Sequence, residues 1–444
     1  MPPSRRHVIA AGAISSAALL GSGAFGEAVA QASGLKPGSP DDQSAALSRA
    51  LAAATRQGRP LVLAPGVYRV SQVALPDGTH LAGVPGLTRL VPAGDGPLLR
   101  AEKAARIGVT GLVLDGMLAP IPERAGMLHL EDVDAVDLSQ LNLLRAGRNA
   151  VTLIRCGGRI DRCRIARALK AAIWSLDGKG LAITGNHVEG CANNGILVHR
   201  LVRGLDRAII AGNRVDDTAA LDGGTGPNGN GINVFRADGV IIEGNSVRNS
   251  AFTAIRAADS GDVAISGNSC LVSGETGMYV EFAYEGAAVS GNLVDGAATG
   301  ISITNFDHGG RLAAVTGNVV RNLFRREVPE GGATGYGVGI AVEADVAVTG
   351  NVVEEAPTAG VLVGWGKFGR NVAATGNMIR RAEVGIAVSI VEGTGRVAIA
   401  GNVIAEARRG AIVGFRWHEA VTGDLSRAGA EVFPQLAIGV NAVG

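Results

Sequence analysis

One short phrase repeats through most of the chain, and this repeat constrains the fold more than any single motif. Residues 263–303 hold two adjacent copies, each with an alternating apolar run, a Gly-Asn pair, a turn of small residues, and a Gly followed by alternating apolar residues. Such a unit must bury its apolar face against its neighbours. Gly-Asn recurs in frame nine times, 23 to 33 residues apart, at Asn186, Asn213, Asn245, Asn268, Asn292, Asn318, Asn351, Asn377 and Asn402, and Gly423-Asp424 is interpreted as a tenth copy.

The period and length of the repeat indicate a parallel β-helix. The apolar residues alternate with period two, so each unit contributes short strands with one buried face. Leucine-rich repeats lack a match here because the Leu framework is absent, and a propeller blade needs about 40 residues. We predict an all-β, right-handed parallel β-helix of about 13 coils, roughly 60 Å long at about 4.8 Å per coil. The stacked Asn amides are expected to hydrogen-bond along the axis.

Composition excludes several other classes. Apolar residues make up 47% of the chain, which is too many for a disordered protein. The 66 glycines follow no triplet period, which excludes collagen. The formal net charge of +1 gives no general electrostatic case for nucleic acid or for an anionic membrane as a partner.

The first 30 residues have the pattern of an export signal. Arg5 and Arg6 precede an Ala-rich apolar stretch, and Ala28-Val29-Ala30 supplies small residues for cleavage. Paired arginines before a weakly apolar core resemble a twin-arginine signal, which predicts the twin-arginine export machinery as a partner and a periplasmic or secreted location. An ordinary secretory signal is the alternative. Later stretches are too short to predict a membrane span in the mature chain.

The remaining chain, residues 31–444, is predicted to be one β-helix domain with a cap at residues 31–80, coils at 81–420 and a closure at 421–444. Asp41-Asp42-Gln43 precedes an Ala-rich helix that should end at Gly58. This opening, together with Pro65-Gly66-Val67-Tyr68, resembles the start of pectate-lyase-like β-helix proteins. In that superfamily a helix plugs the first coil, which would otherwise expose its core and a strand edge.

Near the other end of the chain, residues 415–419 form a polar and aromatic cluster with Trp365 and Lys367. A C-terminal cap is the favoured interpretation, and a sugar-stacking subsite is the alternative.

The cysteines and acids give no sign of a cofactor. Cys156, Cys163, Cys191 and Cys270 fall at different places in the repeat and lack metal-type spacing, so buried free thiols are favoured over a disulfide. The calcium-binding acid cluster of pectate lyases is not evident. We therefore expect neither a metal nor another cofactor, although calcium stays open.

Two insertions interrupt the repeat at the same corner of the coil. The step from Asn to the following Gly normally takes 8 or 9 residues, but 18 separate Asn213 from Gly231 and 21 separate Asn318 from Gly339. Loops 214–230 and 319–338 are thus predicted to stand roughly 20 Å apart along the axis. We interpret them as the walls of a polysaccharide cleft, with neutral surface insertions as the alternative.

Outward positions on the strands between and beside these loops are rich in groups that suit a polyhydroxylated or anionic sugar. An ordinary polar exterior remains the alternative. The predicted substrate-binding residues are His199, Arg200, Asn233, Phe235, Arg236, Thr304, Asn305 and Glu343.

Two sets of residues could supply chemistry on the same stripe. Pectate-lyase-like enzymes use paired acids for hydrolysis or a base beside a uronate for β-elimination. Glu281 with Asp307 is the predicted hydrolase pair. Arg256 and His308, with Tyr279, form the predicted elimination set. The family's adjacent aspartates followed by Gly-His-Gly are absent, so no catalytic residue is carried over.

As a whole, the chain resembles the twin-arginine-translocated β-helix repeat proteins of the pectate-lyase-like superfamily. The resemblance rests on the signal, the Asp-Asp opening and the Gly-Asn repeats, and these motifs specify a fold and not a reaction. The leading hypothesis is an exported protein that binds, and cleaves by lyase or hydrolase chemistry, an extracellular or envelope polysaccharide. The competing hypothesis is a non-catalytic polysaccharide-binding or envelope structural protein.

Overall fold

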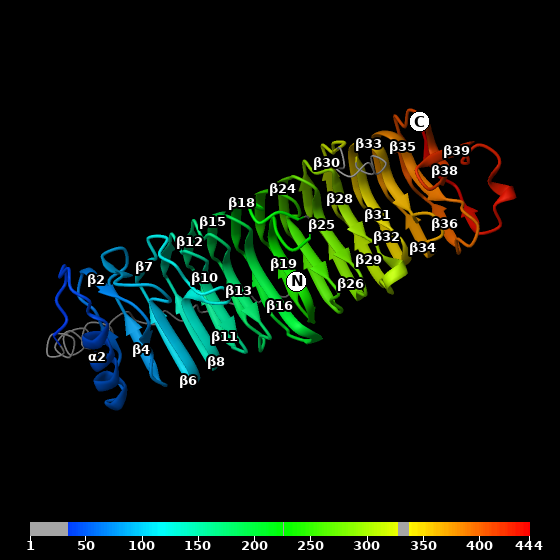
Figure 1. The fold of residues 1–444 in the computed structure, drawn as a ribbon. Helices are drawn as coiled ribbons and strands as arrows, with labels where there is room; N and C mark the ends of the chain where they lie inside the picture. Colours follow the sequence, from blue (N-terminus) through cyan, green and yellow to red (C-terminus); the bar gives the residue numbers. More distant parts are fainter. Residues whose placement is uncertain (1–33, 225, 327–336) are drawn as a thin grey trace, which may run out of the picture.

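The computed structural model describes residues 34–224, 226–326 and 337–444. The predicted signal at 1–30 and most of the predicted loop 319–338 therefore lie outside the described residues. The described chain is a straight rod in which short strands succeed one another from end to end, with helix α2 (Ser44–Arg56) at the N-terminal end (Figure 1). The predicted all-β parallel β-helix is confirmed, with about 13 turns.

The strands stack, coil on coil, into three parallel sheets, which we call A, B and C. Sheet A contains β3 (Val73–Ala74), β10 (Asn149–Ile154), β13 (Ala171–Leu176), β16 (Asn194–Leu205), β19 (Asn230–Asp238), β22 (Ile255–Ala258), β25 (Thr276–Glu281), β28 (Thr299–Ile303), β31 (Val338–Val342) and β38 (Gly410–Arg416). Sheet B contains β1 (Leu61–Val62), β4 (Thr79–Ala82), β11 (Gly158–Asp161), β14 (Ala182–Thr184), β17 (Ile209–Ala211), β20 (Ile241–Glu243), β23 (Val263–Ser266), β26 (Glu285–Ser290), β29 (Arg311–Thr316), β32 (Ala344–Thr349), β34 (Arg370–Thr375), β36 (Val397–Ala400) and β40 (Leu436–Ile438). Sheet C contains β2 (Gly66–Val70), β5 (Thr88–Pro92), β7 (Val113–Asp115), β9 (Asn142–Leu144), β12 (Arg164–Ala166), β15 (His187–Cys191), β18 (Arg214–Thr218), β21 (Ser246–Ser250), β24 (Ser269–Ser273), β27 (Leu293–Asp295), β30 (Val319–Arg321), β37 (Val403–Ala405) and β41 (Ala442–Val443).

Four long strands pass round a corner and belong to two sheets. β6 (Leu99–Thr110) and β8 (Gly126–Ser139) run from sheet A into sheet B, and β33 (Val352–Val363) and β35 (Met378–Ser389) run from sheet C into sheet A. The one antiparallel strand pairing in the described chain joins β39 (Glu419–Asp424) to β38 at the C-terminal end.

A ladder of buried asparagines joins sheet B to sheet C in successive coils. Asn292 is typical: its backbone N–H and its Nδ2 donate to Asn318 Oδ1 at 2.9 Å, and its own Oδ1 accepts the same two bonds from Asn268. The second Nδ2 hydrogen reaches the Ile265 carbonyl at 3.0 Å. The predicted amide ladder is confirmed over all nine Gly-Asn pairs. Each preceding Gly has a φ between 61° and 68°, which is why Gly stands there.

The tenth member of the ladder differs from the prediction. Asn402 donates to Asn441, 39 residues further on, whereas the predicted Asp424 lies in β39. There the Asp424 carboxylate accepts bonds from the backbone N–H groups of Ala411 and Ile412. The C-terminal hairpin was mistaken for a coil because an insertion displaces the true repeat.

The Gly residues that open the sheet A strands form a second column, and close packing inside the rod leaves no room for a side chain at these positions. The Gly that opens the sheet A strand faces the same Gly of the next coil. A Cβ on Gly300 would lie 2.2 Å from Val320 Cγ1 and 2.4 Å from the Gly339 carbonyl oxygen. A larger residue would force the coils apart, so the second half of the repeat begins with Gly for a steric reason.

Both ends of the rod are covered. Helix α2 lies where the sequence predicts it and buries Leu47, Ala50 and Leu51 against the first coils. Its N-cap residue is Gln43, which makes no side-chain capping bond; instead, the Ser44 N–H donates to Oδ1 of the preceding Asp42 at 2.8 Å. At the other end, β40 and β41 add the last strands to sheets B and C. Trp417 lies edge-on to Trp365, with ring centroids 5.9 Å apart, beside the hairpin.

The four cysteines are buried and unpaired, as predicted. Burial raises the pKa of Cys156 to about 11 and the pKa of Cys191 to about 12, so these thiols stay protonated. None of the helices in the described ranges is both long enough and apolar enough to span a membrane.

We predict that Asn292→Ala lowers the free energy of unfolding by about 3 kcal/mol. The change leaves the buried N–H and Nδ2 of Asn268 without their acceptor, and each buried unsatisfied group costs roughly 1–3 kcal/mol. Urea unfolding followed by circular dichroism measures the difference. Asn142→Ala is the matched control, because Asn142 lies on the exterior of β9 (Asn142–Leu144) and its side chain makes no hydrogen bond to a described residue. Equal stability of the two variants would contradict a structural role for the ladder.

Candidate functional site

The exterior of sheet A carries an aligned column of large and polar side chains. The register of successive strands places Trp174, Leu197, Asn233, Arg256, Tyr279 and Ser302 one above the next. A second column lies two residues further along each strand and includes His199, Phe235 and Glu281. Several of these positions face away from the core and yet are covered, since Asn233 is 4% exposed and Glu281 is 3% exposed.

The predicted loop 214–230 begins later than expected, because Arg214–Thr218 forms β18 of sheet C, and its described part after Thr218 contacts this face. The Pro227 carbonyl accepts a bond from Asn194 Nδ2 at 3.0 Å. A Cβ on Gly226 would lie 2.9 Å from Arg256 Nη1, so the loop backbone rests against that guanidinium. The insertion therefore folds onto the predicted stripe and narrows access to it.

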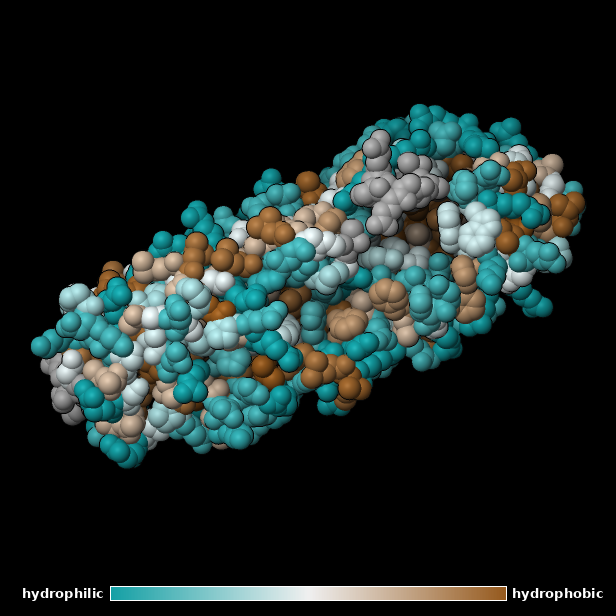
Figure 2. All heavy atoms as spheres, in the orientation of Figure 1, coloured by the Kyte–Doolittle hydropathy of each residue, from teal (hydrophilic) through white to brown (hydrophobic). Residues whose placement is uncertain are grey.

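A hollow of about 500 Å³ lies on the N-terminal side of this loop. Trp174, Leu197 and His199 contribute to its lining, together with Pro227 from the loop, and Arg124 comes from the shorter loop 116–125. The prediction placed the cleft on the C-terminal side of the loop. The far wall of that predicted cleft falls on residues 327–336, which lie outside the described residues. The face in Figure 2 carries scattered brown groups among teal and white ones, without one continuous apolar patch.

Three buried polar atoms at or beside this hollow make no hydrogen bond to any described residue. They are Trp174 Nε1, His199 Nε2 and Asn233 Oδ1. Burial, reinforced by the nearby Arg256 charge, lowers the pKa of His199 to about 4, so its ring is neutral at pH 7. Buried polar groups are normally satisfied by protein or by ordered water, and a ligand with both donors and acceptors could satisfy these three atoms.

Arg256, Glu281 and Tyr279 form a buried charged group next to the hollow. Arg256 binds Glu281 through Nε and Nη2, and their side chains are 12% and 4% exposed. Burial raises the pKa of Glu281 in spite of the Arg256 charge. The Tyr279 ring lies 5.9 Å from the Arg256 guanidinium, and burial and the Glu281 charge raise the pKa of its hydroxyl. The structure thus brings three of the five predicted catalytic residues together.

The other two predicted catalytic residues lie in an exposed turn, η2 (Phe306–His308). His308 Nε2 is 3.5 Å from Asp307 Oδ2, and its ring lies 5.5 Å from the Phe282 ring. Glu281 is therefore engaged by Arg256, while Asp307 pairs with His308.

Glu343 has a buried carboxyl group near the charge of Asp307. Its Oε2 accepts the Phe306 N–H at 2.5 Å, and the residue is 7% exposed. Burial raises the pKa of Glu343 to about 7, and the Asp307 charge adds to this effect. Thr304 Oγ1 lies 3.3 Å from Ser302 Oγ, and Asn305 Oδ1 accepts the Phe282 N–H at 3.3 Å. These predicted binding residues form the C-terminal continuation of the stripe.

The predicted arginines beyond the strands point to other partners. Arg200 donates to the Gly178 carbonyl at 3.2 Å and approaches the buried Asp206 carboxylate at 3.7 Å, away from the hollow. Arg236 pairs with Asp259 at 3.2 Å, and its guanidinium stacks 4.7 Å from the Phe235 centroid. Phe235 in turn lies edge-on to His199, at 5.9 Å.

The sequence analysis did not identify Trp174, which lines the hollow. Its strand begins Ala171-Ala172-Ile173, without the Gly that marks later copies, so the column seemed to start at Leu197. Extending the apolar alternation by one coil would have found it. Within the described ranges, His, Cys, Asp and Glu side chains form no group of three or more that could hold a metal ion.

Comparisons with known proteins agree with the fold. The family described as a right handed beta helix region matches residues 201–379, which confirms the predicted hand. No curated protein matches the sequence. Among solved structures, the surface adhesin PfbA of Streptococcus pneumoniae is 15% identical, with 87% of this chain and 90% of that chain covered and a TM-score of 0.44.

Two enzyme structures are similar at the same level. The A-module of the mannuronan C-5 epimerase AlgE6 from Azotobacter vinelandii is 14% identical, covers 94% of this chain and 98% of its own, and has a TM-score of 0.40. The catalytic unit of a GH87 alpha-1,3-glucanase from Streptomyces thermodiastaticus is 13% identical, with 94% and 68% covered and a TM-score of 0.46. These likenesses concern the fold alone.

We predict that Glu343→Gln stabilises the protein at pH 8 by about 2 kcal/mol and leaves it unchanged near pH 4.5. The raised pKa means that folding is favoured by this group below its unfolded value of 4.5 and that the contribution is lost as the pH rises through about 7. Gln keeps an oxygen for the Phe306 N–H and cannot ionise. Urea midpoints between pH 4.5 and 8 measure the effect.

The exposed Glu285→Gln is the control for that series. A Glu343→Gln advantage that fails to grow with pH would contradict the assigned burial of this carboxyl.

Proposed function

We propose that this is an exported protein that binds a polysaccharide on the exterior of sheet A, in the hollow beside loop 214–230. The observation that carries the proposal is the cluster of three buried, unsatisfied polar atoms on Trp174, His199 and Asn233. Sugar hydroxyls both donate and accept hydrogen bonds, so one ligand class can serve the indole N–H, the imidazole nitrogen and the amide oxygen together.

The lining of the hollow suits this ligand in two further ways. The Trp174 ring offers a flat apolar surface for a sugar face, and its N–H is a donor at the edge. Arg124, Arg148 and Lys170 lie around the hollow, where they can bind hydroxyl or carboxylate oxygens. Lys170 is held by Asp222 and Arg148 by Glu123, while Arg124 forms no ion pair with any described residue.

Cleavage of the bound polymer is the second candidate function, favoured by the raised pKa of Glu281. A buried carboxyl with a raised pKa takes up a proton more readily than a solvent-exposed one, which is what a general acid requires. Tyr279 and Arg256 would lie beside the reacting sugar, for protonation or for charge stabilisation. In this form of the proposal Asp307 and His308 act from the exposed turn at the C-terminal side.

We predict that Trp174→Ala and Asn233→Ala each weaken binding of the recognised polysaccharide about 5- to 30-fold. The losses follow from removal of the stacking surface and of a buried acceptor, each worth about 1–2 kcal/mol. A panel of neutral and acidic polysaccharides, measured by affinity electrophoresis and calorimetry, identifies the ligand first. Leu362→Ala is the matched control, since Leu362 occupies the same exterior column seven coils from Trp174. A ligand whose affinity is unchanged in both variants would place its binding site elsewhere.

The same panel separates binding from cleavage. We predict that turnover, followed as reducing ends and as absorbance of unsaturated uronates, falls at least 100-fold in Glu281→Gln while binding persists. A general acid typically contributes 10²–10⁴-fold. Asp307→Asn and His308→Gln test the exposed turn separately. If the bound polymer stays intact with the unmodified protein, the non-catalytic form of the proposal stands.

We also propose that residues 1–30 direct export through the twin-arginine pathway to the periplasm or beyond. The Arg5-Arg6 pair and the small residues before residue 31 support this. Conversion of both arginines to lysine should retain the full-length precursor in the cytoplasm, seen by fractionation. Unchanged export would indicate the ordinary secretory route.

A further inference from the structure

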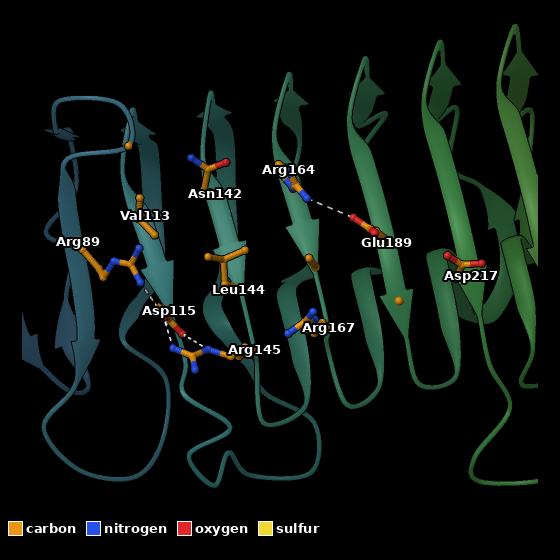
Figure 3. Close-up of a pocket in the computed structure, with 13 residues that line it drawn as sticks. Arg89, Val113, Asp115, Asn142, Leu144, Arg145, Arg164, Arg167, Glu189 and Asp217 are labelled. Atoms are coloured by element: carbon orange, nitrogen blue, oxygen red, sulfur yellow. Dashed lines mark hydrogen bonds and ion pairs between the residues drawn. The ribbon is translucent and has the colours of Figure 1, made fainter.

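A second hollow, of about 600 Å³, lies on the exterior of sheet C, around the corner from the polysaccharide hollow (Figure 3). Arg89, Arg145, Arg164 and Arg167 contribute four positive charges to it, against the carboxylates of Asp115, Glu189 and Asp217. Four arginines against three carboxylates leave one positive charge in excess. The arginines stand on three coils, those of β5, β9 and β12, and Asp217 lies at the far end of the hollow (Figure 3).

A buried carboxylate holds two of these arginines in place. Asp115 is 1% exposed and accepts bonds from Arg89 Nη1 at 2.8 Å and from Arg145 Nε at 2.9 Å and Nη2 at 2.6 Å. Burial alone would raise the pKa of Asp115, but the bonds from Arg145 and the Met117 N–H and the charges of both arginines outweigh it and lower the pKa. Since a guanidinium has five N–H donors, several remain available on Arg89 and Arg145.

The other two arginines differ in their engagement. Arg164 Nη2 pairs with Glu189 at 3.2 Å. Arg167 directly follows β12, at the corner where the backbone is left-handed, with φ at 58°. It binds no carboxylate in the described part of the protein. Its charge, and the spare donors on Arg89 and Arg145, are directed to a hollow that has an excess of positive charge.

An apolar hollow of about 400 Å³ adjoins this cationic one, and the two share Arg145, Arg167, Gly190 and Asp217. It is lined by Leu118, Leu169 and Leu221, which are 48%, 45% and 77% exposed. Leu118 belongs to loop 116–125, Leu169 to the turn between β12 and β13, and Leu221 to loop 214–230. Ion pairs between neighbouring coils explain the other arginines of this face. They explain neither the three exposed leucines nor Arg167, which has no carboxylate partner among the described residues.

We propose that the two hollows form one site for an amphiphile with a phosphate-type head group and an alkyl chain. The three acceptor oxygens of a phosphate match the spare guanidinium donors, and the alkyl chain covers the leucines. The cationic end alone would suit any small anion, and the apolar end alone any apolar chain. Their continuity through Arg145 and Arg167 selects a ligand that carries both parts.

The test uses the full mature chain and measures calorimetric affinities for octyl, decyl and dodecyl phosphate, each below its micelle concentration. At about 0.8 kcal/mol per buried CH₂, each added methylene should tighten binding up to about fourfold. Inorganic phosphate and dodecyltrimethylammonium should bind at least 10-fold more weakly than dodecyl phosphate. Equal affinity for inorganic phosphate would mean an anion site without a chain, and equal affinity for the cationic amphiphile would mean an apolar patch without head-group recognition. Either result overturns the proposal.

Two surface variants divide the ligand into its parts. Arg167→Gln should weaken every phosphate probe about 10-fold, and Leu169→Ser should flatten the chain-length dependence while it leaves inorganic phosphate unchanged. Arg381→Gln is the control for Arg167, because Arg381 occupies the same left-handed corner in a later coil. Val272→Ser is the control for Leu169, because Val272 is an exposed apolar side chain outside both hollows. Unchanged affinities in both test variants would overturn the assignment. Trp174→Ala should leave the alkyl phosphates unaffected, so this inference and the polysaccharide proposal fail independently.

Discussion

The amide ladder is the interaction on which the rest of the rod depends. Each Asn donates two hydrogen bonds to the next, at 2.9 to 3.1 Å, so the coils from Asn186 onward are locked in register with their neighbours. Because the side-chain period of a strand is two, a slip of one residue would move the core face outward. Register fixed at one corner therefore fixes which side chains align along all three sheets. The aligned exterior column on sheet A beyond Leu197 follows from this constraint, whereas the coils of Arg89, Asp115 and Arg145 precede the ladder and are aligned by strand pairing.

A solenoid confines an insertion to the coil that carries it. Each coil contacts only its neighbours, so a long loop can be added at a corner without disturbing the ladder or the glycine column. In this protein the insertion starts after β18 ends at Thr218, and it returns to the coil at Asn230, which donates two hydrogen bonds to Asn194 in the preceding coil. The loop then folds back across the Trp174 side of sheet A. The position of the long loop thus determines where the hollow forms, while the coils beneath it keep the same geometry as the rest of the rod.

The sequence predicted the fold closely and the site in part, and the reasons are physical. Period and spacing determine the coils, the ladder, the capping helix and the buried thiols, because these depend on local pattern and stacking alone. The pairing of Arg256 with Glu281 depends on which neighbours lie one coil away and how deeply the loop covers them, which no local pattern encodes. Trp174 was missed because its strand lacks the marker Gly. Asn441 was missed because the C-terminal hairpin lengthens the last spacing to 39 residues.

The two proposed sites lie on either side of one corner of the coil, and adjacent residues of one turn line different sites. Leu169 lines the apolar hollow and Lys170 lines the polysaccharide hollow, so the same turn presents opposite properties to the two faces. Loops 116–125 and 214–230 contribute to both hollows. A change in either loop should therefore affect both sites, whereas changes on the strands, at Trp174 or Arg164, act on one. Two exterior faces of a rigid rod, bordered by the same pair of loops, allow separate ligands to be held at a fixed distance from each other without any moving part.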